Sequence, residues 1–329
     1  MRKLILSLVF IGIFFLHSSV SIQAQEVLGI HILAPGEINE AKELLQTSSN
    51  ESKWKHVTVP FTLTDIEKGP QWQAFFDECE KYKFIPILRL ATKAEGNYWT
   101  VPTKKDIVQL TSALKKLDWP TEERLVIVFN EPNHAKEWGN SLDPEEYADV
   151  LAFTSSWLKT EKEKYIVLPA GMDLAAPNGN VTMEAFTYWR RAMKHNPELL
   201  ASIDAWNSHS YPNPGFSSAP AKKDKMSLRG YQHELAFVEP LASKKFDVYI
   251  TETGWEENYS TTKKLESYYA YAAKNIWSDE RIKAVTPFLL KGAPGPFEKF
   301  SFFDESGEKT KQFEAYRKVI ETASEQEGV

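Results

Sequence analysis

Two glutamates stand where apolar segments of the chain end, and this placement marks them as candidates for chemistry. Residues 126–129 read Val-Ile-Val-Phe and run into an Asn-Glu-Pro motif that contains Glu131. Residues 248–250 read Val-Tyr-Ile and run into a Thr-Glu-Thr-Gly-Trp motif that contains Glu252. A carboxylate after a buried segment is unfavourable unless partners or a function offset its desolvation. Glycosidic cleavage needs such a pair, because one carboxylic acid protonates the leaving oxygen while one carboxylate attacks or supports the anomeric carbon.

The distance between the two carboxyl groups would decide the stereochemical outcome. A separation of about 5 to 5.5 Å lets the second carboxylate act as a nucleophile and retains the configuration, whereas about 6.5 to 9.5 Å leaves room for water and inverts it. The spacing of Glu131 and Glu252 in the sequence leaves both outcomes open.

The elements that must position these glutamates alternate regularly along the chain. Eight short apolar segments, rich in β-branched and aromatic residues, alternate with amphipathic segments of helical period. Such alternation predicts an α/β fold with a parallel sheet, and eight units predict a single closed (β/α)₈ TIM barrel. A doubly wound sheet is the alternative, but no Gly-rich phosphate loop follows the first segment. The predicted strands are 27–33, 56–63, 84–90, 125–129, 165–170, 203–208, 248–251 and 284–290, and the predicted helices are 37–46, 71–82, 105–117, 144–158, 183–195, 230–241, 262–277 and 312–322.

The first 24 residues have the pattern of a secretory signal peptide. Arg2 and Lys3 precede an apolar segment over 4–16, and small and polar residues ending at Ala24 follow it. The apolar segment is short for a spanning helix, so cleavage and secretion are favoured over an uncleaved N-terminal anchor. We therefore expect residues 25–329 to form the barrel as one domain, with no integral membrane span after cleavage.

Composition narrows the classes of partner. The net charge of −6 argues against nucleic acid or an anionic membrane as the main partner. One cysteine, Cys79, excludes an intrachain disulfide framework. The seven histidines form no His-x-x-x-His or His-x-His pair, so we predict neither a metal site nor another cofactor. The oligomeric state stays open.

The two glutamate motifs, in this order and at these strand ends, resemble those of the clan A glycoside hydrolases. The resemblance implies a retaining hydrolase that cleaves a β-linked oligo- or polysaccharide through a covalent glycosyl-enzyme intermediate. It also implies that Glu131 is the acid/base, that Glu252 is the nucleophile, and that Asn130 donates to the sugar 2-hydroxyl.

Further candidates follow other strand ends. His209 and Tyr211 follow the sixth predicted strand, in a segment similar to the His-x-Tyr of several clan A families. There the Tyr211 hydroxyl could hydrogen-bond Glu252 and hold it ionised, although both side chains could instead serve only the local structure. Arg89 ends the third strand and could pair with either glutamate or form a structural ion pair.

Aromatic and histidine side chains near the strand ends are candidates for sugar contacts. Trp99, Trp138 and Trp255 lie in predicted loops, where a ring could stack on a pyranose, and Trp255 is the strongest candidate because it follows the Glu252 motif. His31 ends the first strand and faces either the same cleft or the core. The eighth strand lacks the Trp that clan A enzymes often carry there, so Phe288 or Phe297 could replace it.

A second class of function remains open. A barrel of this kind could bind glycan without cleaving it, or serve as a surface scaffold, because a fold alone does not establish activity. The presence of both carboxylates at the expected strand ends favours an enzyme.

Overall fold

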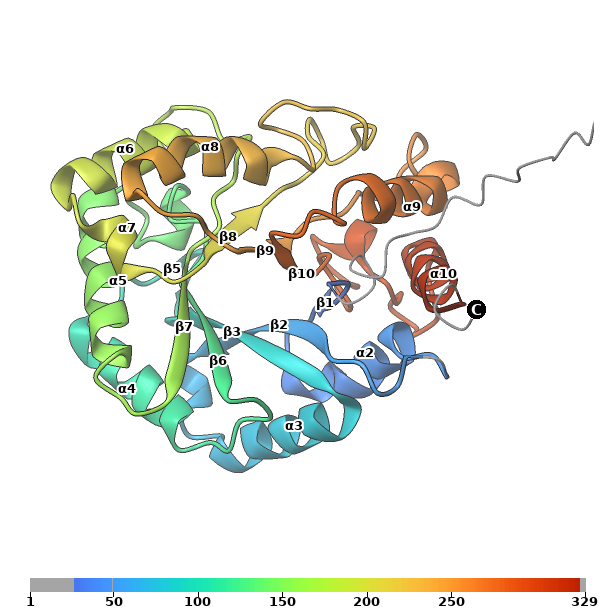
Figure 1. Cartoon of the computed structure of the whole chain (residues 1–329), viewed down its shortest axis with the longest axis horizontal. Coiled ribbons are helices and arrows are strands. Elements are labelled where there is room, and N and C mark those ends of the chain that lie inside the picture. The colour runs from blue at the N-terminus through green and yellow to red at the C-terminus, as the bar shows by residue number, and fades with distance from the viewer. Residues whose placement is uncertain (1–26, 49, 326–329) are drawn as a thin grey trace, which may run out of the picture.

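Short segments in which apolar residues dominate form the strands at the centre of the molecule (Figure 1). The computed structural model describes residues 27–48 and 50–325. Eight parallel strands lie within these residues: β1 (Ile30–His31), β2 (Lys55–Thr62), β3 (Phe84–Ala91), β6 (Glu123–Val128), β7 (Lys164–Pro169), β8 (Trp206–His209), β9 (Val248–Glu252) and β10 (Ile282–Val285).

The strands pair in two arcs. The larger arc has the order β1-β2-β3-β6-β7, and the smaller arc has the order β10-β9-β8. One junction between the arcs is closed by a parallel bridge from Leu28 to Val285. At the other, between β7 and β8, the backbone N–H of Asp204 donates to the carbonyl of Val167 at 2.9 Å, and the Asp204 carboxylate accepts from the N–H of Val167. The arcs therefore close into a barrel, which confirms the predicted fold class.

Helices surround the barrel because each crossover between parallel strands must cover the sheet (Figure 1). A small antiparallel hairpin, which the sequence did not predict, follows β3 and consists of β4 (Ala94–Glu95) and β5 (Tyr98–Trp99). The helices are α2 (Ile38–Leu45), α3 (Gly69–Tyr82), α4 (Lys104–Lys115), α5 (Pro144–Leu158), α6 (Ala185–His195), α7 (Leu199–Ser202), α8 (Gly230–Ala242), α9 (Leu265–Asn275) and α10 (Lys311–Glu325), with 3-10 helices η1 (Pro35–Glu37), η2 (Leu63–Asp65), η3 (Ala135–Glu137), η4 (Thr262–Lys264) and η5 (Glu298–Phe300).

Local sequence explains where several helices begin. Thr103 caps α4, since its hydroxyl accepts from the N–H of Asp106 while the Asp106 carboxylate accepts from the N–H of Thr103. Asp143 caps α5 by accepting from the N–H of Glu146, and Pro144 occupies the first helical position. These caps fix where α4 and α5 begin, and the two helices follow β3 and β6, whose ends carry residues of the candidate site.

The inside of the barrel is filled below the site by a compact apolar cluster drawn from several strands. Side chains along a strand point alternately to the two faces of the sheet, so every second residue enters the interior. The cluster consists of Ile87, Leu125, Ile127, Leu168, Ala205, Tyr249 and Ala284. It forms the floor above which the polar strand ends meet.

The eighth strand differs from the sequence prediction. It was expected over 284–290, but β10 ends at Val285. Leu289 and Leu290 are apolar because they are buried under the loop that follows, where the N–H of Phe302 donates to the carbonyl of Leu290 at 3.1 Å. The apolar residues at the end of the predicted strand therefore indicate burial and not strand structure, because the chain leaves the sheet after Val285.

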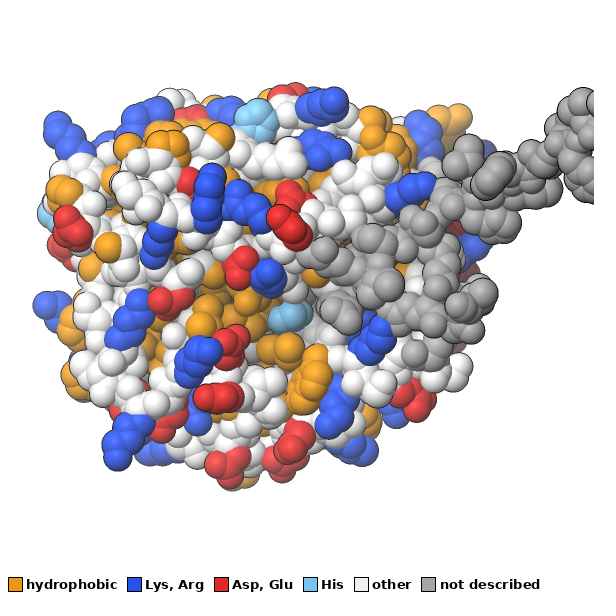
Figure 2. All heavy atoms as spheres, in the orientation of Figure 1, with side chains coloured by type: hydrophobic (Ala, Val, Ile, Leu, Met, Phe, Trp, Pro, Cys, Tyr) orange, Lys and Arg blue, Asp and Glu red, His pale blue; other side chains and the backbone are white. Residues whose placement is uncertain are grey.

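The predicted signal peptide, residues 1–24, lies outside the described residues. Within the part of the chain that the structure describes, no helix is both long and apolar enough to span a membrane. Figure 2 shows acidic and basic side chains interspersed over one face of the molecule, in keeping with the modest net charge of −6.

Candidate active site

The loop after β6 carries Glu131 in an unusual backbone conformation. Phe129 and Glu131 have φ angles of 68° and 29°, a region that residues other than glycine rarely adopt. Such conformations cost on the order of 1–3 kcal/mol each and cluster at functional sites. The turn is held by hydrogen bonds from the N–H of Glu131 to the carbonyl of Gly171 and from the N–H of His134 to the carbonyl of Glu131.

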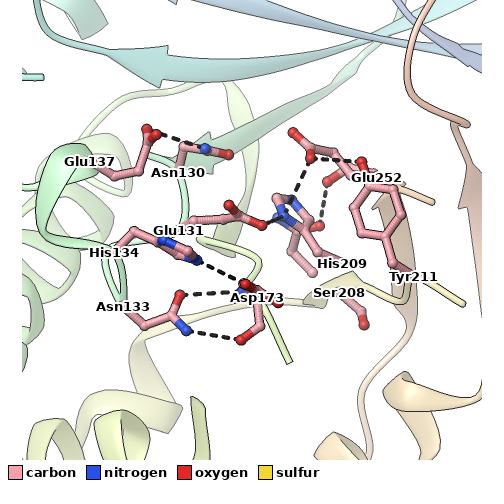
Figure 3. A network of polar contacts seen from close by, with 12 residues as sticks. Asn130, Glu131, Asn133, His134, Glu137, Asp173, Ser208, His209, Tyr211 and Glu252 are labelled. Atoms are coloured by element: carbon pink, nitrogen blue, oxygen red, sulfur yellow. Dashed lines mark hydrogen bonds and ion pairs between the residues drawn. The ribbon is translucent and has the colours of Figure 1, made fainter. Parts of the chain in front are cut away.

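Glu131 and Glu252 meet at one mouth of the barrel, although 121 positions separate them in the chain (Figure 3). Each contributes a carboxylate oxygen to a group of atoms that all lie within 4.8 Å of one another, and His209 supplies the third. Nδ1 of His209 is 2.8 Å from Oε1 of Glu131 and 3.6 Å from Oε2 of Glu252. The two carboxylates are therefore near enough to act on one atom of a substrate.

Glu252 is buried and held by three polar neighbours. Nη1 of Arg89 donates to Oε1 at 2.6 Å, and the Tyr211 hydroxyl donates to Oε2 at 3.1 Å. Burial alone would raise the pKa of Glu252, but the charges of His209 and Arg89 and the bond from Tyr211 outweigh it and hold the pKa well below its ordinary value of 4.5. Glu252 is thus ionised at neutral pH.

His209 sits between the two glutamates and is itself buried. Burial favours its neutral form, but the charge of Glu252 and the hydrogen bond to Glu131 outweigh that effect and raise its pKa. Its ring lies against Gly171, where an added Cβ would come within 2.2 Å of Cδ2 of the imidazole. Only glycine at position 171 leaves room for the ring.

A second histidine–carboxylate pair lies on the other side of Glu131. Nε2 of His134 is 2.9 Å from Oδ2 of Asp173, and the Asn133 amide bonds to the backbone of Asp173 (Figure 3). The hydrogen bond to Asp173 and the charge of Glu131 raise the pKa of His134 despite its burial. Asp173 follows β7, so the strand-end argument that selected Glu131 could also have found it.

The cleft above these residues has a volume of about 830 Å³. Its polar lining includes Glu131, His134 and Asp173. Aromatic side chains line the same cleft, among them Trp99 of β5. They are Trp99, Phe129, Trp138, Tyr211, Phe216, Phe288, Phe297 and Phe300. Phe288 and Phe297, considered as substitutes for the missing Trp, both belong to this lining.

Two of the predicted sugar contacts need correction. Trp255 is 0% exposed, its indole N–H donates to the carbonyl of Ser218, and its ring packs against Tyr268 and Tyr269. Trp138 reaches the edge of the cleft but is 1% exposed and bonded to Glu146. Neither ring offers a free face to a sugar, because the loops turn both indoles into the layer between barrel and helices.

His31 is also a core residue and does not line the cleft. It is fully buried, and its Nδ1 lies 3.0 Å from the carbonyl of Thr251. Burial and the charge of Arg89 lower its pKa to about 3, so the ring is neutral at ordinary pH. This corrects the expectation that it contacts substrate and agrees with the alternative of a core histidine.

Arg89 and Asn130 lie in the cleft, as the sequence predicted for side chains at strand ends. Arg89 pairs with Glu252, which resolves the question of which glutamate it contacts, and the same Nη1 donates to Oδ1 of Asn130 at 2.8 Å. Glu137 of η3, which the sequence analysis did not identify, accepts from the Asn130 amide at 3.3 Å. No pattern in the sequence marks Glu137, because it lies in an irregular loop.

The group formed by Glu131, His209 and Glu252 has the spacing of a metal site. The Arg89 guanidinium already bonds Glu252, and a cation there would meet the positive charge of Arg89. The donor set therefore suits proton transfer and nucleophilic chemistry better than metal binding, and the absence of a metal stays a prediction.

The comparison with protein families identifies the chain. A model of the glycosyl hydrolase catalytic core matches residues 92–316, which span the ends of β6 to β10. The chain belongs to the glycosyl hydrolase catalytic core family. This membership confirms the resemblance to clan A glycoside hydrolases, and no curated protein sequence matches the chain.

Solved structures share the fold of this glycosyl hydrolase core at low sequence identity. XacCel5A, in complex with cellopentaose, is 14% identical, with a TM-score of 0.59 over 90% of this chain and 99% of its own. A GH5_18 protein from Streptomyces cattleya, in complex with Manβ1-4GlcNAc, is 12% identical, with a TM-score of 0.61 over 90% of this chain and 80% of its own. A GH128 endo-β-1,3-glucanase from Pseudomonas viridiflava is 13% identical, with a TM-score of 0.53 over 88% of this chain and 96% of its own.

Proposed function

We propose that this glycosyl hydrolase is a retaining enzyme that cleaves a neutral β-linked oligo- or polysaccharide, with Glu252 as nucleophile and Glu131 as acid/base. The observation that carries the proposal is the pair of carboxylate oxygens within 4.8 Å of each other. This closeness of the nearest oxygens supports a separation of the carboxyl groups nearer the about 5 to 5.5 Å of retaining enzymes than the roughly 6.5 to 9.5 Å of inverting ones.

The environments of the two glutamates support different roles. Glu252 is held ionised by His209, Arg89 and Tyr211, as a nucleophile requires. Glu131 is more exposed, and only its Oε1 bonds to a side chain among the described residues, namely His209. Its Oε2 is left to face a substrate oxygen.

In the first step, a carboxylate oxygen of Glu252 forms a bond to the anomeric carbon while the bond to the leaving oxygen breaks, and that oxygen takes the proton of Glu131. In the second step, Glu131 removes a proton from water, the water oxygen attacks the anomeric carbon, and the ester to Glu252 breaks. Esterification removes the negative charge of Glu252, which had raised the pKa of His209. Loss of its proton leaves Glu131 negatively charged at the same stage, so His209 still has a carboxylate as its hydrogen-bond partner when Glu131 acts as a base.

The character of the substrate follows from the cleft. Six carboxylates line it (Glu131, Glu137, Asp173, Glu252, Glu256 and Glu298) against three side chains of Lys and Arg (Arg89, Lys136 and Lys299). This balance disfavours an anionic glycan. The aromatic rings and hydrogen-bonding groups that line the cleft together match the apolar faces and hydroxyl edges of pyranose rings. The oligosaccharides bound by two proteins of the same fold support this class of ligand.

The decisive experiment is a hydrolysis assay of the wild type and three variants. The panel consists of 4-nitrophenyl β-glycosides, β-glucan, mannan, xylan and galactan. We expect Glu252→Ala to abolish turnover, and Glu131→Ala to retain activity only on substrates with activated leaving groups, which need no acid. A matched Glu308→Ala, at an exposed acid remote from the cleft, should behave as the wild type.

Stereochemistry and covalency are tested separately. NMR of the first product should show the β-anomer, and a 2-deoxy-2-fluoro glycoside should label Glu252 in a peptide digest. An α-anomer would overturn retention. Binding of glycan without any cleavage would support the alternative of a non-catalytic barrel.

A further inference from the structure

The amide of Asn130 is held from both sides. Its Oδ1 accepts from Nη1 of Arg89 at 2.8 Å. Its Nδ2 donates to Oε2 of Glu137 at 3.3 Å (Figure 3). A guanidinium can only donate and an ionised carboxylate can only accept, so these neighbours fix which end of the amide is oxygen and which is nitrogen. Asn130 is thus locked in one orientation.

This orientation leaves one donor free. The Nδ2 group carries two N–H bonds, and among the described residues only Glu137 accepts from it. Asn130 lines the cleft beside Glu131, so the second N–H is available to a ligand there.

Glu137 occupies a position that is unfavourable for a carboxylate. Its side chain is 13% exposed, and the nearest cation is Lys136 at 3.9 Å. Burial and the charge of Glu131 raise its pKa, in spite of Arg89 and the bond from Asn130. Within the described part of the chain, its one side-chain hydrogen bond is to Asn130. A carboxyl group that is desolvated, lies near another carboxyl group and gains only one side-chain hydrogen bond is more typical of a functional site than of a structural role.

We propose that Glu137 is a positioning residue, which orients the Asn130 amide so that its free N–H donates to the 2-hydroxyl of the sugar under attack. This inference rests on the proposed function. Hydrogen bonds to the 2-hydroxyl strengthen in the transition state of glycoside cleavage, so the angle of the donor matters most there. Without Glu137 the amide keeps only its bond to Arg89 and can swing about that contact.

The test measures how strongly the enzyme distinguishes a 2-hydroxyl from a hydrogen. The probe is a 4-nitrophenyl β-glycoside that the wild type cleaves, together with its 2-deoxy analogue, and the readout is the ratio of their kcat/KM values. We expect Glu137→Ala to lower this ratio by about tenfold, since one hydrogen bond of about 1.4 kcal/mol corresponds to that factor. A general loss of structure would lower both rates and leave the ratio unchanged.

Matched variants separate the hydrogen bond from the charge. Glu137→Gln loses the charge but keeps an oxygen that accepts from Asn130, so its ratio should stay near that of the wild type. Glu256→Ala removes another carboxylate from the cleft, one that pairs with Lys299 and does not contact Asn130, and should also keep the ratio. If Glu137→Ala does not fold, Glu137→Leu makes the same measurement with the volume preserved.

The outcomes distinguish this inference from the proposed function. In an Asn130→Ala background, Glu137→Ala should lower the ratio no further, because both act through the same donor. An unchanged ratio in an active Glu137→Ala enzyme, or an equal drop in Glu137→Gln, would overturn the role of Glu137 and leave the proposed function standing. A wild type that cleaves no glycoside of the panel would overturn both.

Discussion

At the scale of single residues, the cleft depends on how each glutamate is surrounded. His209, Arg89 and Tyr211 stabilise the negative charge of Glu252, whereas among the described residues Glu131 hydrogen-bonds to one side chain, that of His209. Two chemically identical side chains thereby acquire different tasks from their environments. Arg89 is central because it contacts Glu252 and Asn130 with the same nitrogen.

Replacing Arg89 by methionine should move the acidic limb of the pH profile to higher pH. Arg89 is one of the charges that hold the pKa of Glu252 low, so its loss raises that pKa. The nucleophile must be ionised, and a higher pKa means that activity is lost sooner as the pH falls. The measurement is kcat/KM from pH 3 to 8. Arg124→Met, which removes an arginine that bonds Tyr165 at the far end of the barrel, should leave the limb in place. If the acidic limb of the pH profile does not move in Arg89→Met, Arg89 does not lower the pKa of Glu252 as described.

Gly171→Ala should impair catalysis while the protein stays folded. The new methyl group would lie 2.2 Å from the His209 ring, which must then shift away from Glu131. A displacement of this size can cost about a hundredfold in rate. The comparison is Gly36→Ala, where nothing lies within 4 Å of the added Cβ. Equal kcat values for the two variants would show that the position of His209 is unimportant.

At the scale of elements, loops decide which aromatic rings meet the substrate. The hairpin of β4 and β5 brings Trp99 to the cleft, and the carbonyl of Trp99 accepts from the N–H of Gly139 at 2.8 Å. The loop after β9 instead turns Trp255 inward. Sequence position next to a catalytic motif therefore does not determine which indole is accessible.

The two tryptophans should respond differently to substitution. Trp99→Ala is expected to raise KM for oligosaccharides and to leave the melting temperature nearly unchanged, because the ring is only partly buried and its backbone bond survives. Trp255→Ala should destabilise the fold by about 3–5 kcal/mol, the usual effect of truncating a buried tryptophan. Chemical denaturation and initial-rate kinetics check both variants. A rise in KM without loss of stability in Trp255→Ala would reverse the assignment.

The sequence predicted the strand ends well and the side-chain directions poorly. Glu131, Glu252, His209, Tyr211 and Arg89 were found because the ends of parallel strands converge at one mouth of a barrel. Two of the three loop tryptophans, Trp138 and Trp255, were misplaced, since the path of an irregular loop is set by tertiary contacts such as the bond from Trp255 to Ser218, whereas Trp99 lines the cleft. Gly171 and Glu137 were missed for a related reason. Gly171 matters because it leaves room for the ring of His209, which comes from another strand end, and Glu137 matters through its one side-chain hydrogen bond, to Asn130. Neither role leaves a periodic pattern in the sequence.

At the scale of the whole molecule, acidic and basic side chains are interspersed over the face shown in Figure 2, whereas acidic ones predominate in the cleft. Six carboxylates line the cleft, against three side chains of Lys and Arg. A polyanion would therefore meet repulsion where its backbone must enter.

Neutral polysaccharides should accordingly be better substrates than acidic ones of the same linkage. We expect a neutral β-glucan to be cleaved and its carboxymethylated form to be cleaved more slowly as the degree of substitution rises. Added salt should reduce the difference, because it screens charges over about 8 Å at physiological ionic strength. Reducing-end assays at two salt concentrations make the measurement. Faster cleavage of the carboxymethylated polymer would contradict the expected repulsion.

The division of the barrel into two arcs has a consequence for how function is distributed along the chain. Arg89 and Glu131 belong to the larger arc, while His209, Tyr211 and Glu252 belong to the smaller one, so the bonds from Arg89 to Glu252 and from His209 to Glu131 cross between them. Neither arc alone contains all the residues of the candidate active site. If the polypeptide were severed between β7 and β8, each fragment would be inert, and hydrolysis would return only when the fragments reassembled, which would make turnover a direct reporter of their docking.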